Sequence, residues 1–115
     1  MRVIRLLRAT VWPLLRRAFP RHAEAMTVAA RHSAMVRLGE ILRRAAREAG
    51  EAERGDDVLT AGIALDSCED VEDGAKRYHT AGLISDEQHD FFLVWAARYR
   101  QTAEDVLERH TEGSA

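Results

Sequence analysis

Five histidines and one cysteine are the residues of this sequence that could bind a metal ion or transfer protons. The histidines are His22, His32, His79, His89 and His110. No two of them have the H-x-x-x-H or H-E-x-x-H spacing that places two imidazoles on one side of a zinc-binding helix. Cys68 is alone, so we expect neither a disulfide nor a cysteine-based metal site. The sequence therefore predicts a chain that is not an enzyme and that uses no metal or cofactor.

Arginine is the more informative residue type. Arg43, Arg44 and Arg47 lie at i, i+1 and i+4 of an expected helix, and Arg37 lies about two turns before Arg44. A guanidinium group binds two phosphate oxygens at once without reading a base. Aromatic residues do not interleave these arginines, so we do not expect bases to stack on this helix. The four arginines are therefore candidates for contacting the backbone of RNA or single-stranded DNA.

A row of acidic residues follows in the next expected helix. Asp66, Glu69, Asp70 and Asp73 are spaced at i, i+3, i+4 and i+7, which places all four on one helix face. Neighbouring like charges at this spacing destabilise a helix by a few tenths of a kcal/mol. The row is either a solvated face or a docking surface for arginines of a neighbouring subunit.

The two halves of the chain carry opposite charge. Residues 1–54 contain twelve arginines and five acids, whereas residues 55–115 contain fourteen acids and five basic residues, and the net charge of −2 hides this separation. The halves could neutralise each other through exposed ion pairs, which contribute about 0–1 kcal/mol each. Alternatively, the basic half binds phosphate and the acidic half binds a protein neighbour.

The elements that must position these residues are helices. Apolar residues recur with a helical period, only two prolines occur, and both precede residue 21. Ser85 and Gln88 form a capping box, Asp56 or Asp57 can cap another helix, and Gly82 suits the position after a helix end. We expect helices over residues 3–11, 21–49, 56–81 and 86–109, with a polar linker over residues 51–54.

The predicted fold is all-α, a compact antiparallel bundle of three to four helices in a single domain over residues 1–115. Alanine occupies several core positions where a monomeric bundle would carry leucine, so we expect a partner to supply part of the stability. The uncharged runs are much shorter than the ~20 residues that span a bilayer. Together with the lone cysteine, this predicts a cytoplasmic protein.

The first twenty residues contain arginines and apolar residues but no acid. Such a segment can lie on an anionic membrane surface as a basic amphipathic helix. More often it packs its apolar side on its own bundle, so we do not expect a membrane partner.

In size, helical class, arginine content and lack of catalytic residues, the chain resembles the small helical subunits of CRISPR ribonucleoprotein effector complexes. The resemblance covers the whole chain and involves no motif. It implies a non-catalytic subunit that stacks on neighbouring subunits, including copies of itself, and supports nucleic acid by its backbone. Two other interpretations remain: a protein-only adaptor, inhibitor or regulator of the phage type, and a peripheral membrane protein that uses the basic N-terminal segment.

Overall fold

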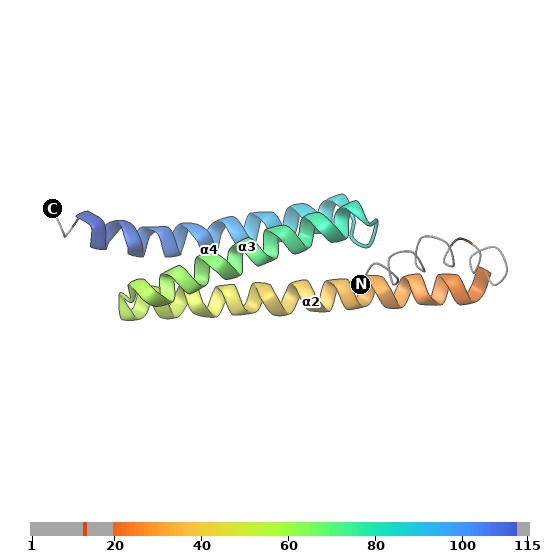
Figure 1. Ribbon diagram of the computed structural model, residues 1–115, viewed down its shortest axis with the longest axis horizontal. Helices are drawn as coiled ribbons and strands as arrows, with labels where there is room; N and C mark the ends of the chain where they lie inside the picture. The colour runs from red at the N-terminus through yellow and green to blue at the C-terminus, as the bar shows by residue number, and fades with distance from the viewer. Residues whose placement is uncertain (1–12, 14–19, 113–115) are drawn as a thin grey trace, which may run out of the picture. The chain divides into compact units, whose positions relative to one another are not determined.

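The computed structural model describes residue 13 and residues 20–112, and these residues form three long helices with no strand among them. Helix α2 spans Pro20–Gly55, α3 spans Val58–Thr80 and α4 spans Asp86–Glu112 (Figure 1). The all-helical fold is confirmed for these residues. The additional helix that we predicted over residues 3–11 lies outside the described residues.

The chain divides into two units, residues 1–33 and residues 34–115. In the first unit, the described part of α2 exposes every side chain from residue 24 to residue 33 except that of Thr27, which is half-buried. In the second unit, the remainder of α2 packs with α3 and α4, and consecutive helices run in opposite directions (Figure 1). All of the candidate site residues belong to this second unit.

Local signals set the helix ends around the two turns. The carboxylate of Asp57 accepts hydrogen bonds from the backbone N–H groups of Leu59 and Thr60, which have no partner inside the helix. Ser85 and Gln88 bond to each other's backbone N–H groups, as the capping box predicts. Gly82 has a φ of 73°, in the left-handed region that glycine enters without steric cost.

The polar linker that we predicted over residues 51–54 is wrong, because α2 continues to Gly55. Gly50 suggested a break, but a single glycine in a helix costs only about 1 kcal/mol relative to alanine. Ala49 and Ala52 flank it and are fully buried against α3 and α4, so packing compensates for the weak propensity. The chain reverses instead at Asp56, which has a φ of 49°.

The core of the second unit consists of two clusters. The first contains the larger side chains, with Leu38 of α2, Val71 of α3 and Phe92 of α4 at its centre. The second is made almost entirely of alanine, with one valine: Ala49, Ala52, Ala61, Ala64, Ala103 and Val106. Alanine side chains bury little apolar area, so this end of the bundle gains less from the hydrophobic effect.

Gly74 fixes how closely α2 and α3 approach. A Cβ atom at this position would lie 3.0 Å from Cδ2 of Leu38, which is itself fully buried. The glycine thus lets the leucine side chain of α2 rest on the backbone of α3. This close approach brings the arginines of α2 next to the polar side chains of α3.

Candidate nucleic-acid interface

A groove lies between α2 and α3, with a volume of about 790 Å³. Residues of α2 supply most of its wall, and Asp70, Gly74, Arg77 and Tyr78 of α3 supply the rest. All four arginines that we predicted as phosphate contacts line it: Arg37, Arg43, Arg44 and Arg47. The spacing of these arginines along α2 therefore places them on one surface.

Arg77, which we did not predict as a phosphate contact, also lines the groove. It lies seven residues after Asp70, on the same face of α3, and its guanidinium group joins those of α2. The groove therefore holds five arginines against two acids, Glu40 and Asp70. The i, i+7 spacing from Asp70 places Arg77 on the face of the acidic row of α3. The packing of α3 on α2 brings Arg77 close to the four arginines of α2.

Four of the five groove arginines have no partner among the residues that the structure describes. Within the described residues, the side chains of Arg37, Arg43, Arg47 and Arg77 make no hydrogen bond or ion pair. The arginines of α2 are exposed, as is Arg77. Their donors are therefore available to an anionic ligand without first breaking an intramolecular bond.

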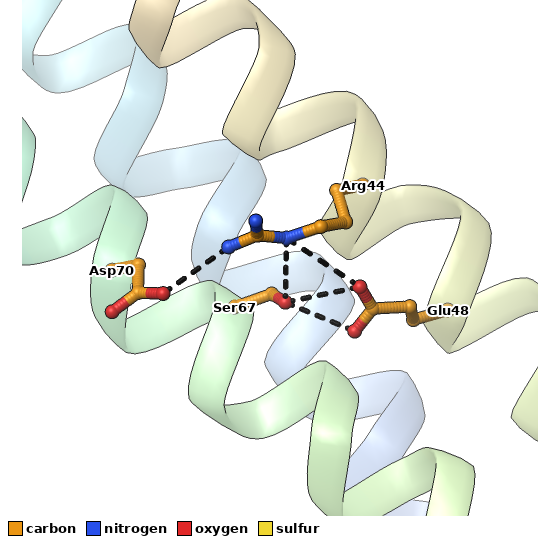
Figure 2. A network of polar contacts seen from close by, with 4 residues as sticks. All are labelled: Arg44, Glu48, Ser67 and Asp70. Atoms are coloured by element: carbon orange, nitrogen blue, oxygen red, sulfur yellow. Dashed lines mark hydrogen bonds and ion pairs between the residues drawn. The ribbon is translucent and has the colours of Figure 1, made fainter.

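Arg44 differs from the other arginines because it belongs to a polar network (Figure 2). Its Nη2 donates to Oδ2 of Asp70 at 3.2 Å, and its Nε donates to the hydroxyl of Ser67 at 3.3 Å. The same Nε lies 3.6 Å from a carboxylate oxygen of Glu48. Arg44 thus links α2 to α3, and less of its bonding capacity is available to an outside ligand.

Glu48 is the buried acid of this network. Its side chain is 11% exposed, and its two oxygens accept from the hydroxyl of Ser67 at 2.9 Å and 3.2 Å (Figure 2). A buried carboxylate is costly unless it is paired and hydrogen-bonded. We did not predict a role for Glu48 or Ser67, although Arg44 and Glu48 show the i, i+4 spacing of a helical ion pair.

The acidic row of α3 lies on an exposed face. Asp66, Glu69, Asp70 and Asp73 are all exposed. Asp70 pairs with Arg44, so one residue of the predicted docking set contacts one of the predicted phosphate set. The other three make no ion pair within the described part of the chain.

Internal pairing accounts for little of the charge separation. Within the described residues, Arg44–Asp70 is the one ion pair that joins the basic residues up to 54 to the acidic residues after them. The remaining pairs lie within one half, such as Arg100 with Glu72 at 2.7 Å and Arg109 with Asp56 at 3.9 Å. Most of the basic charge near the groove is therefore not neutralised by the acidic helices.

The histidines and the cysteine show no arrangement for metal binding in the part of the chain that the structure describes. His79 and His89 stack with their ring centroids 4.4 Å apart, and Nε2 of His79 lies 2.5 Å from Asp86. His89 is half-buried and partly covered by His79. Cys68 is fully buried, and its burial raises the pKa of the thiol from 9.0 to about 11.

The basic N-terminal segment that could contact a membrane lies outside the described residues except for Pro13 and Pro20. Among the helices of the described residues, none is both long and apolar enough to cross a bilayer.

Comparisons with known proteins returned no similarity: no protein family model, no curated protein and no solved structure matches this chain.

Proposed function

We propose that this chain is a non-catalytic subunit of a nucleoprotein assembly that holds the backbone of RNA or single-stranded DNA in the arginine groove. The observation that carries the proposal is the convergence of Arg37, Arg43, Arg47 and Arg77 on one groove, where their side chains have no hydrogen-bond or ion-pair partner among the described residues. A guanidinium group donates two parallel hydrogen bonds to phosphate oxygens, and such contacts position a strand without reading its sequence.

The shape of the groove favours a single strand over a duplex. Proteins that read a duplex commonly insert a protruding helix or ribbon into the major groove. Here the arginines line a concave space of about 790 Å³ between two helices. This volume is in the range of roughly 300–1,000 Å³ that is typical of sites for small ligands. An extended strand a few nucleotides long suits such a space.

The test variant replaces three groove arginines that make no ion pair within the described residues, and it keeps Arg44 because Arg44 also neutralises the buried Glu48. The variant carries Arg43→Gln, Arg47→Gln and Arg77→Gln, and fluorescence anisotropy measures its binding to labelled oligo(U) and oligo(dT). We expect affinity to fall for both, and the slope of log K against log salt to flatten by about 0.7 for each lost phosphate contact.

A matched control removes three positive charges outside the groove, with Arg54→Gln, Lys76→Gln and Arg109→Gln. It changes the net charge by the same amount, so it measures the effect of net charge alone. If the two variants bind equally well, or if neither oligonucleotide binds the wild-type chain, then the groove is not a nucleic-acid site.

A further inference from the structure

Large apolar side chains are exposed on two helices of the second unit. On α3, Leu59 is 75% exposed and Ile63 is 48% exposed. On α4, Phe91 is 53% exposed and Val94 is 51% exposed. The spacings i, i+4 and i, i+3 place each pair on a single helix face. Two short apolar strips therefore face outward from different helices.

Each strip continues into a charged residue. Asp66 follows Ile63 by three residues, and Arg98 follows Val94 by four, so each charge lies on the face of its strip. Neither makes an ion pair within the described residues. The guanidinium carbon of Arg98 lies 4.6 Å from the ring centroid of Trp95, and this cation–π contact holds the side chain along α4.

We propose that copies of this chain associate head to tail, the α4 strip of one copy packing on the α3 strip of the next. The strips match in order and in charge: Leu59 meets Phe91, Ile63 meets Val94, and Asp66 meets Arg98. The helices are then parallel across the interface. The partner is a second copy because this one chain carries both complementary surfaces.

The acids at the other end of the α3 strip already have partners, which favours the parallel orientation of the two helices. Asp56 lies 3.9 Å from Arg109 and 3.1 Å from His110, and Asp57 caps α3. In the antiparallel orientation Arg98 would approach these occupied carboxylates, whereas Asp66 makes no ion pair within the described residues. A two-fold pairing of α4 with α4 would bring Arg98 of one copy to Glu87 of the other, but it would leave the exposed α3 strip uncovered.

Because the two surfaces differ, the contact is heterologous and can add one copy after another. The α3 strip lies in the first half of the helix, whereas the groove residues Asp70, Gly74, Arg77 and Tyr78 lie in its second half. The proposal does not depend on nucleic-acid binding, because none of the six strip residues lines the groove.

Sedimentation velocity of the full chain, freed of nucleic acid, tests the contact over a range of concentrations at low salt. We expect the mean mass of the wild-type chain to rise with concentration. Phe91→Asp and Ile63→Asp should each give monomers, because each destroys one strip. Their equimolar mixture should form a dimer and nothing larger, because each variant keeps the strip that the other has lost. A monomeric wild-type chain, or a mixture that stays monomeric, overturns the proposal.

Charge reversal tests whether Asp66 of one copy meets Arg98 of the next. Circular dichroism first verifies that each variant is folded. Asp66→Arg and Arg98→Asp should each weaken association at least about tenfold, since each places like charges together. The association of the double variant should recover to within about threefold of that of the wild-type chain. Asp73→Arg, which lies outside the strips, should weaken association less than Asp66→Arg does. A double variant no better than the single variants overturns the pairing. The groove variant Arg43→Gln, Arg47→Gln, Arg77→Gln should associate like the wild-type chain, which separates this proposal from nucleic-acid binding.

Discussion

The substitution Ser67→Ala should destabilise the fold far more than the loss of one hydroxyl group suggests. The hydroxyl donates to the buried carboxylate of Glu48 and accepts from Nε of Arg44. Without it, the one partner of Glu48 among the described residues is Arg44, at 3.6 Å, and Arg44 is half-exposed. Hydrogen bonds to charged groups contribute about 1.5–3 kcal/mol each. We expect the free energy of unfolding to fall by about 2 kcal/mol.

Urea unfolding followed by circular dichroism at 222 nm measures this loss, with Thr80→Ala as the matched control. Thr80 is an exposed hydroxyl residue of the same helix, so its substitution should change stability by less than about 0.5 kcal/mol. In a Glu48→Met background the cost of Ser67→Ala should fall to the level of the control, because the buried charge is gone. An equal cost in both backgrounds would refute the assignment of this energy to Glu48.

Two further predictions concern titrating groups. Because the pKa of Cys68 is about 11, two units above its ordinary value, the native chain at pH 8 holds about 100-fold less thiolate than the unfolded chain. Ellman's reagent should therefore react only after unfolding, and rapid reaction of the native chain would show that α3 is not packed as described. Hydrogen bonds from the side chain and backbone of Thr60 and the backbone of Leu59 hold the pKa of Asp57 below 3.8. A lowered pKa stabilises the fold above the unfolded value, so the stability gap between wild-type and Asp57→Ala chains should narrow as pH falls below 3.8, and a constant gap would contradict this.

The helices were predictable because their ends depend on neighbouring residues. Asp57 and the pair Ser85–Gln88 cap helices through bonds spanning three residues or fewer, which sequence spacing shows directly. The error at residues 51–54 arose because Gly50 is a local signal, whereas the burial of Ala52 depends on α3 and α4. Tertiary packing overrode propensity at this point.

The part of the candidate site that lies on α2 was predictable from residue spacing, whereas its contacts with α3 were not. The spacing of Arg37, Arg43, Arg44 and Arg47 places them on one surface, and the structure places all four along one groove. The spacing does not show that Ser67 and Asp70 of α3 bind Arg44, because these pairs are separated by 23 and 26 residues. It also does not show that Arg77 joins the groove.

The mixture of charges in the groove connects the two proposals. Glu40 and Asp70 offset part of the positive charge, and Arg44 is held by Asp70, so one copy should bind a phosphate backbone only weakly. Weak sites become effective when several of them engage one strand, because each later contact forms at a high effective concentration. A head-to-tail row of copies would supply this repetition without any sequence-reading contact. Oligonucleotide affinity should then rise with length in the wild-type chain and become independent of length in Phe91→Asp, which keeps every groove arginine. Equal length dependence in both would show that the grooves act singly.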